Sequence, residues 1–202
     1  MGRKKGDTKE KILEEALKLF SINGFEAVSI RTIADCVGIG NSALYKHFKN
    51  KREIFDSIVE MLMKRYMEQC SMITAQIRGL ADVKKCCLTM FEYQTKNEEI
   101  VAFRRLLLLE KFKDPNIAAI YKKFFVDIPV ENQVNIFLEL QKEGLMIEGD
   151  VKVFAMELYA PFYLYHFVDH EEDELIELYN KHLEYFFRGH FISEKKDKEM
   201  ET

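Results

Sequence analysis

The chain has 202 residues, of which 48% are hydrophobic and 12% aromatic, and this composition excludes an intrinsically disordered protein. With only 9 Gly and 3 Pro, turn residues are too scarce for a sandwich or barrel of many short strands. The net charge of −4 is small, so the distribution of charge along the chain is more informative than its sum. The sequence predicts an all-α protein with room for one domain, or for a small domain joined to a larger one.

Charge is distributed unevenly along the chain. Residues 1–52 hold 11 Lys and Arg against 6 Asp and Glu, a net of +5, whereas residues 53–202 hold 19 against 28, a net of −9. A basic N-terminal part on an acidic body predicts that only the N-terminal part meets a polyanion.

We expect a cytoplasmic protein without membrane contact. The N-terminus is charged with no apolar run behind it, so no signal peptide is expected. The longest uncharged aromatic stretch, Leu158 to Val168, is too short to span a bilayer. The four cysteines, Cys36, Cys70, Cys86 and Cys87, form no CxxC motif and should be reduced. For Cys86 and Cys87 we expect ordinary buried thiols rather than a redox pair, because a disulfide between adjacent helical residues is strained.

The N-terminal part predicts four helices from apolar residues spaced three and four apart. Gly24 ends the first of these helices, because glycine readily takes the left-handed conformation found there. Ser29 has the residue type and position of the cap of the second, and Gly38 lies in a tight turn after it. The expected helices cover residues 7–23, 29–36, 41–48 and 51–75.

The rest of the chain predicts a succession of further helices. Asp114 and Pro115 form a start signal, an acidic cap followed by proline in the first turn. Pro129 opens the next helix, which Gly144 ends, and Asp150 starts another. The expected helices cover residues 80–96, 98–112, 114–126, 129–142, 150–170 and 172–189.

Residues 29–48 have the pattern of a helix-turn-helix, two short helices joined by a Gly-containing turn and braced by a preceding helix. In this motif the second helix lies in the major groove of DNA with its N-terminal residues toward the base edges. A solvated helix face is the alternative for a basic cluster, but the motif and the charge together favour DNA contact. Between residues 27 and 52 the only acid is Asp35, against five bases: Arg31, Lys46, Lys49, Lys51 and Arg52.

The stretch from Ile12 to Phe55 resembles the N-terminal DNA-binding domain of TetR-type (TetR/AcrR) transcriptional regulators. The matching elements are ALKLF…NGF, SIRTIAD and, above all, ALYKHFKNK. The resemblance implies an all-α fold of about nine helices: a three-helix helix-turn-helix domain over residues 1–51, then a larger ligand-binding and dimerisation domain over residues 52–202. It implies a regulator and not an enzyme, and no nucleophile–base arrangement, Gly-rich phosphate loop or carboxylate pair stands out in the sequence.

Carried over residue by residue, the resemblance implies eight DNA contacts. Ser29 would meet a phosphate through its hydroxyl and the start of its helix. Arg31 would reach a base edge or a flanking phosphate, and Asn41 and Ser42 would probe bases. The eight residues are Ser29, Arg31, Asn41, Ser42, Tyr45, Lys46, His47 and Lys51.

The remaining contacts would hold the DNA without reading it. Tyr45 and Lys51 would bind the phosphate backbone, while Lys46 and His47 would lie beside the groove wall as further phosphate or base contacts. Gly40 departs from the family pattern, because the family often has Ser or Thr as the cap of the recognition helix. We therefore expect this helix to lack a side-chain cap.

The C-terminal part is rich in aromatic residues, since 13 of the 16 Phe and 8 of the 9 Tyr follow residue 52. A plain helical core is the alternative for each of them, but together they are typical of a mostly apolar ligand cavity. The effector-binding candidates are Met90, Tyr93, Phe103, Leu107, Phe124, Phe137, Tyr159, Phe162, Tyr163 and His166.

We expect no cofactor and no metal. His166 and His170 have the i,i+4 spacing of metal ligands, but without further ligands at a known spacing we favour surface or interface histidines.

The last two expected helices are the predicted homodimer interface. Their apolar stripes are wide enough to face both the core and a partner. One short recognition helix reads too few bases, so DNA binding also requires a dimer. The predicted interface residues are Leu158, Phe162, Leu175, Leu178, Tyr179, Phe186 and Phe187.

Together these expectations describe a transcriptional repressor. A homodimer binds a double-stranded DNA operator that is pseudo-palindromic, and a small, largely apolar effector releases it. The helix over residues 51–75 would connect the effector site to the DNA-binding domain. Two alternatives stay open: a DNA-binding architectural protein of the same fold that needs no ligand, and a helical enzyme.

Overall fold

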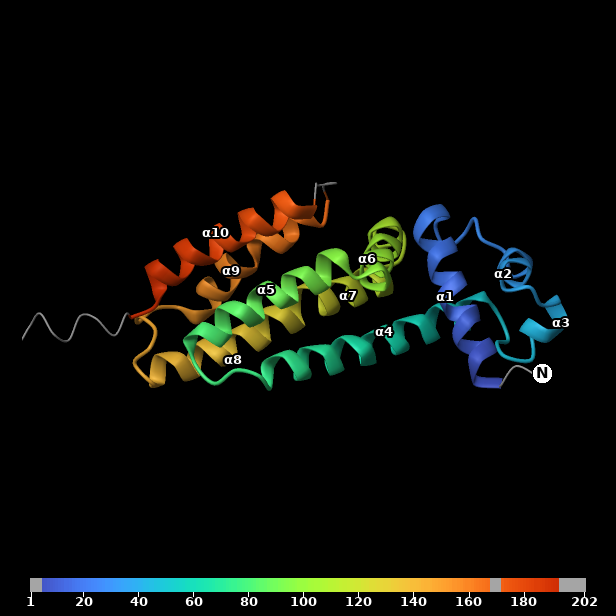
Figure 1. Cartoon of the computed structure of the whole chain (residues 1–202). Helices are drawn as coiled ribbons and strands as arrows, with labels where there is room; N and C mark the ends of the chain where they lie inside the picture. Colours follow the sequence, from blue (N-terminus) through green and yellow to red (C-terminus); the bar gives the residue numbers. More distant parts are fainter. Residues whose placement is uncertain (1–4, 168–171, 193–202) are drawn as a thin grey trace, which may run out of the picture. The chain divides into compact units, whose positions relative to one another are not determined.

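The computed structural model describes residues 5–167 and 172–192 (Figure 1). Over these residues the all-α prediction is confirmed, and the only extended pairing is one antiparallel bridge between Met146 and Phe191. No helix in this part of the chain combines the length and the apolar character needed to cross a bilayer. The helices are α1 (Lys5–Asn23), α2 (Ile30–Val37), α3 (Asn41–Leu44), α4 (Lys51–Thr74), α5 (Leu80–Lys96), α6 (Glu98–Glu110), α7 (Pro115–Lys122), the π-helical η1 (Lys123–Asp127), α8 (Ile128–Lys142), α9 (Val151–Tyr165) and α10 (Glu172–His190).

Local sequence signals explain most helix ends. Asn97 caps α6 by accepting the N–H of Ile100 at 3.1 Å, and Asp150 caps α9 as predicted. Gly24 ends α1 with φ of 81°, a conformation that residues with a Cβ avoid. These ends are set by neighbours in sequence, which is why the helical pattern locates them.

Several helices end earlier than predicted, α6 at Glu110 rather than residue 112 among them. α3 stops at Leu44 rather than residue 48, and the chain continues in tight turns in which the N–H of His47 donates to the carbonyl of Leu44 at 2.8 Å. α9 stops at Tyr165, and the N–H of His166 is shared between two carbonyls, as is common at helix ends. The predicted end at His170 lies outside the described residues.

A π-helical turn joins α7 to α8 where the sequence predicted a new helix opening at Pro129. Proline has no N–H to donate to the carbonyl four residues before it, here that of Phe125, and its ring would clash with that carbonyl. The wider π turn at residues 123–127 precedes Pro129, so the helix continues without a break. The turn buries both Phe124 and Phe125.

The chain forms two compact units. Unit 1 comprises Met1–Met72 and Lys96–Lys122, and unit 2 comprises Ile73–Thr95 and Lys123–Thr202. Unit 1 therefore contains the helix-turn-helix together with α6 and α7, while unit 2 contains η1, α8, α9, α10 and nearly all of α5. The functional boundary at residue 51 stays a prediction.

The core of unit 1 is built on α1, which packs against α2 and α6. Ile12, Ala16 and Phe20 form its fully buried stripe. The ring of Phe25, just after α1, lies 5.2 Å from that of Phe20 and 5.5 Å from that of Phe55 on α4. These apolar contacts hold the start of α4 and the loop after α1 against one core.

The core of unit 2 is largely aromatic. Phe91 on α5 stacks on Tyr179 of α10 with ring centroids 3.8 Å apart, and meets Phe162 of α9 edge-on at 4.9 Å. α8 packs against α9 and η1, and α10 packs against α9. Phe91 therefore links three helices of this unit.

All four cysteines are free thiols, as predicted, but they differ in accessibility. Cys36 is exposed, Cys86 is partly buried and donates to the carbonyl of Ile73 at 3.3 Å, and Cys70 and Cys87 are buried. Burial raises the pKa of Cys70 to about 11 and that of Cys87 to about 12.

We expect Cys36 to react with iodoacetamide much faster than Cys70 and Cys87 in the folded protein at about pH 8, because the thiolate is the nucleophile. At that pH the two buried groups, with pKa values of about 11 and about 12, are protonated and shielded from the reagent. Peptide mapping by mass spectrometry measures the labelling, and unfolding in guanidinium chloride should expose all four thiols. Equal labelling of Cys36 and Cys87 in the native protein would contradict the described burial.

Candidate nucleic-acid interface

The first helix of the motif, α2, begins at Ser29 as predicted. The Ser29 hydroxyl accepts the N–H of Thr32 at 3.0 Å and lies 2.8 Å from the Thr32 hydroxyl. This cap satisfies one of the backbone N–H groups that have no partner within the helix. Both side chains are exposed, so the start of α2 faces solvent.

Gly38 makes the turn between α2 and α3. Its φ of 76° is left-handed, and the N–H of Ile39 donates to the carbonyl of Ala34 at 3.0 Å, which closes the end of α2. Apolar side chains from both helices then fix the inner face of the motif. These are Ile33, Val37, Leu44 and Phe48, each at most 2% exposed.

The opposite face carries six of the eight predicted contacts, all of them exposed: Ser29, Arg31, Asn41, Ser42, Tyr45 and Lys46. Tyr45 is 54% exposed, which favours a contact role over a packing role. Arg31 lies 3.9 Å from the carboxylate of Asp35, with both side chains mostly in solvent. Such exposed pairs are weak, so the guanidinium remains available to a ligand.

The recognition helix α3 starts without a side-chain cap, as the presence of Gly40 predicted. Asn41 and Ser42 occupy its first turn and are exposed. The arrangement therefore offers two small polar side chains and a bare glycine where a base edge would approach.

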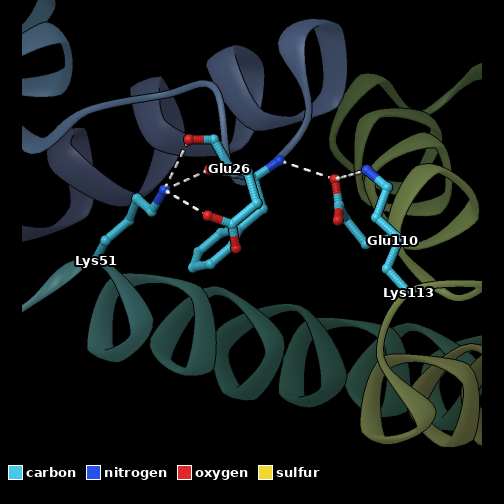
Figure 2. A network of polar contacts seen from close by, with 5 residues as sticks. Glu26, Lys51, Glu110 and Lys113 are labelled. Atoms are coloured by element: carbon cyan, nitrogen blue, oxygen red, sulfur yellow. Dashed lines mark hydrogen bonds and ion pairs between the residues drawn. The ribbon is translucent and has the colours of Figure 1, made fainter.

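The last two predicted contacts are half-buried. His47 lies in the turns after α3, and Lys51 starts α4. The Lys51 ammonium donates to the carbonyls of Phe25 at 2.7 Å and Glu26 at 3.2 Å, and lies 4.4 Å from the centroid of the Phe25 ring (Figure 2). Lys51 therefore has an internal role, and its phosphate contact stays a prediction.

Lys9 is a basic residue of this region that the sequence did not single out. It is exposed on α1, and its ammonium lies 5.4 Å from the centroid of the buried Phe48 ring. Lys9 thus extends the positive charge of the motif onto the first helix. The sequence did not indicate this role of Lys9, because the helix around it is rich in Lys and Glu and because its contact, Phe48, is far away in the chain.

Comparison with known proteins gives the same assignment. Residues 12–58 match the family described as "Bacterial regulatory proteins, tetR family". The helix-turn-helix-type transcriptional regulator YhgD of Bacillus subtilis is 36% identical over 63 residues, which cover 31% of this chain and 33% of that protein. The aligned segment thus spans about a third of this curated relative.

The similarity to solved structures extends over nearly the whole chain. A TetR-family regulator from Mesorhizobium loti superimposes with a TM-score of 0.73 at 16% identity, covering 95% of this chain and all of that one. Residues 12–58 thus match the TetR family in sequence, and the described part of the chain has the fold of a TetR-family structure. A second structure of similar fold, described as a complex of SmeT with triclosan, has a TM-score of 0.71 at 22% identity and covers 93% of each chain.

The effector candidates predicted from the sequence fall into both units. Phe103 and Leu107 belong to unit 1 and the others to unit 2. Seven are buried; Met90, Tyr93 and Tyr163 are partly buried. In unit 2 the structure brings several together on α9, where Tyr159 stacks on Phe162 at 4.1 Å between ring centroids.

Phe137 lies in the same buried core but contacts other rings directly. It stacks on Phe186 at 5.8 Å and meets Phe191 edge-on at 6.1 Å. His166 is 7% exposed and meets Phe125 edge-on at 5.6 Å. The expectation of a surface histidine is therefore wrong for His166, while His170 lies outside the described residues. Among the described residues no group of three or more potential ligands could hold a metal ion.

Several buried polar side chains were not expected. Gln94 is fully buried, and its amide oxygen accepts the hydroxyl of Tyr159 at 2.8 Å. α6 buries Arg104 and Glu110, which are 7% and 3% exposed. One signal in the sequence indicated that Gln94 is buried: it continues the apolar stripe of α5, whose members recur every three or four residues. The burial of a charged or amide side chain is nevertheless rarely predicted from its residue type.

The predicted interface residues also need correction. Five of them face the core of their own protomer, at 7% exposure or less: Leu158, Phe162, Leu175, Tyr179 and Phe186. Leu178 is 46% exposed and Phe187 is partly buried, so only these two could reach a partner. The outward apolar residues of this region are instead Val153, Met156, Leu164, Phe167 and Tyr185, together with Leu178. We call these six the outer stripe.

Proposed function

We propose that the protein is a cytoplasmic, DNA-binding transcriptional repressor. The observation that carries the proposal is the geometry of the helix-turn-helix. Its apolar inner face is buried, and six polar side chains at the positions where the family contacts DNA are exposed on the opposite face. The match to the TetR family over residues 12–58 covers this same segment. A basic exposed face on a rigid helical motif is suited to the major groove.

We propose further that the DNA-binding form is a homodimer on a pseudo-palindromic operator. α3 has only four residues in helical conformation, so one copy can read few bases. The outer stripe offers apolar surface to a partner, since large exposed apolar side chains that gather in one patch mark association sites.

The DNA contacts can be tested on the duplex that the wild-type protein selects from a random-sequence pool. Arg31→Ala should relax preference at a defined base pair and cost about 1–3 kcal/mol there. Tyr45→Phe should weaken binding to all sequences alike, because phosphate contacts position without specifying. Lys46→Ala should flatten the log–log salt slope by roughly one unit per half-site.

Fluorescence anisotropy over a range of salt concentrations measures these effects. Lys142→Ala is a matched control, because Lys142 is exposed on α8 in unit 2, outside the helix-turn-helix, and forms an ion pair with Glu139. A mutant Arg31→Ala that selects the same motif with the same stringency would remove Arg31 from the base contacts.

The effector proposal rests on the interior of unit 2. There Tyr159 stacks on Phe162 and donates its hydroxyl to the amide oxygen of the buried Gln94, so that aromatic rings lie beside a polar pair. The hydroxyl of Tyr179 is buried and has no hydrogen-bond partner among the described residues. A small, mostly apolar molecule with one polar group would suit such surroundings, and the triclosan complex of the similarly folded SmeT supports this class of ligand.

The protein would exist in two forms, one that fits the operator and one that does not. The effector releases the DNA only if its affinity is higher for the form that does not fit the operator. A thermal-shift screen of apolar, anionic and cationic compounds, followed by DNA titration with each hit, tests this. We expect apolar or aromatic hits that weaken operator binding by a coupling of about 1–3 kcal/mol, with the DNA weakening the effector equally. Stabilising hits that leave DNA affinity unchanged would favour a regulator without ligand control.

A further inference from the structure

Asp35 is the one acid in the basic stretch of the helix-turn-helix, since no other Asp or Glu lies between residues 27 and 52. It is exposed on α2, one helical turn after the predicted DNA contact Arg31 and on the same face of the helix. A carboxylate close to the phosphate backbone weakens DNA binding by repulsion. A role of Asp35 in recognition would offset that repulsion.

The carboxylate of Asp35 lies behind the guanidinium group of Arg31. Its Oδ2 is 3.9 Å from Nε of Arg31, the nitrogen nearest the stem of the side chain. An ion pair through Nε leaves the two terminal nitrogens, Nη1 and Nη2, for hydrogen bonds to a ligand. Side chains on a helix lean toward its N-terminus, so Asp35 reaches toward Arg31 while Arg31 extends toward the start of α2. That start, at Ser29, is the end of α2 that is predicted to meet the DNA.

The charge of Asp35 affects the choice between the two partners that the sequence left open for Arg31, a base edge and a phosphate. A phosphate bound to Arg31 would bring a second anion close to the Asp35 carboxylate, which is unfavourable. A guanine edge presents O6 and N7, two acceptors without a net charge, and these match Nη1 and Nη2 in geometry. DNA that covers this face also removes water from the Arg31–Asp35 pair, so the attraction within the pair increases.

We propose that Asp35 is a positioning residue that directs Arg31 to a guanine edge rather than to a phosphate. The inference rests on the proposed function, because it requires a helix-turn-helix that binds DNA. Arg31 makes the contact with the base, and Asp35 acts only through Arg31. Asp35 therefore increases the discrimination at one base pair of each half-site and leaves the preference at the other base pairs unchanged.

The test is a double-mutant cycle on the full chain: wild type, Arg31→Ala, Asp35→Ala and the variant with both substitutions. The duplexes are the one that the wild type selects from a random pool, its single base-pair variants and a shuffled sequence. Anisotropy gives the discrimination at each base pair, which is the ratio of the dissociation constants for the changed and the selected duplex. Thermal unfolding checks that each variant is folded.

Two further variants separate the position of the carboxylate from its charge. Asp35→Glu keeps a carboxylate within reach of Arg31. Glu68→Ala removes an exposed acid from α4, outside the motif, and is the matched control. Glu68 pairs with Lys64 at the same i,i+4 spacing and at the same distance of 3.9 Å, so both alanine variants change the net charge equally and break a similar pair.

We expect Asp35→Ala to lower the discrimination about threefold or more at the base pair that Arg31→Ala relaxes, within the range measured for residues in contact. The affinity for the shuffled duplex should not fall, because the substitution removes a negative charge. When Arg31 is already alanine, Asp35→Ala should change the discrimination no further. Asp35→Glu should keep most of the wild-type discrimination, and Glu68→Ala all of it.

Three results would overturn the inference and leave the proposed function intact: wild-type discrimination in Asp35→Ala, a loss at a base pair that Arg31→Ala does not relax, or a further loss in the double variant. Unchanged discrimination in Arg31→Ala would also overturn it, because Asp35 would then have no base contact to direct. A wild-type protein that selects no duplex would overturn the proposed function, and the inference with it.

Discussion

Leu178→Asp should turn the proposed homodimer into monomers at low micromolar concentration. Leu178 is 46% exposed on α10 and belongs to the outer stripe, so a partner that covers this face would bury the new carboxylate without a counter-charge. Burying an unpaired charge is strongly unfavourable, while the isolated protomer can keep the aspartate in solvent. The monomer should still fold, because the side chain does not belong to the core cluster of unit 2.

Operator affinity should fall with the dimer, by about 100-fold or more, because the second half-site no longer binds at high effective concentration. Sedimentation velocity measures the oligomeric state, and anisotropy measures binding to the selected duplex. Leu109→Asp is a matched control: Leu109 is 44% exposed, but on α6 in unit 1. A Leu178→Asp protein that stays dimeric, or a Leu109→Asp protein that dissociates, would move the interface away from the outer stripe.

Much of the fold could be predicted because it is encoded locally. The bounds of α5 agree with those expected from the apolar period, and Ser29 and Asp150 cap the helices that the sequence assigned to them. A cap and its partner lie within three residues of each other, so the signal is complete in a short window. The outward face of the helix-turn-helix was predictable for the same reason, since the inner positions are apolar at helical spacing.

The roles of Lys51 and Glu110 could not be predicted, because their partners are remote in sequence. Lys51 and Phe25 are 26 residues apart, and Glu110 and Phe25 are 85 residues apart. A lysine beside a DNA-binding motif indicates phosphate contact from charge alone. The folded structure, in which α1 packs against α6, shows that Lys51 and Glu110 both bind the backbone of the loop after α1.

The direction of the apolar stripes on α9 was ambiguous for a different reason. α9 is apolar on nearly all sides: Val153 and Met156 face outward while Ala155, Leu158 and Tyr159 face the core. Amphipathic helices are oriented by their polar face, and a helix that lacks one can be rotated without an evident cost in the sequence. The contacts of α5 and α8 settle which side is buried, and those contacts involve residues far away in the chain.

Phe91→Ala should destabilise unit 2 by about 3–5 kcal/mol, the usual cost of deleting a fully buried phenylalanine ring. Phe91 is fully buried, and its ring is in contact with rings from α9 and α10. The loss has two parts: the transfer energy of the ring and the cavity that the surrounding helices cannot close. Because Tyr179 stacks on this ring at 3.8 Å, the substitution also removes the aromatic contact between α5 and α10.

Urea unfolding at one fixed protein concentration measures this change, since association shifts the apparent stability of a dimer. We expect a lower midpoint with an unchanged slope, which identifies a change in stability rather than in the surface exposed on unfolding. Phe112→Ala deletes the same ring from a position that is 87% exposed, and should change the free energy of unfolding by no more than about 0.5 kcal/mol. If both variants shifted the midpoint equally, Phe91 would not have the buried place between α5, α9 and α10 that the structure gives it. A large shift for Phe91→Ala alone would show that this buried ring, between α9 and α10, stabilises the fold of unit 2.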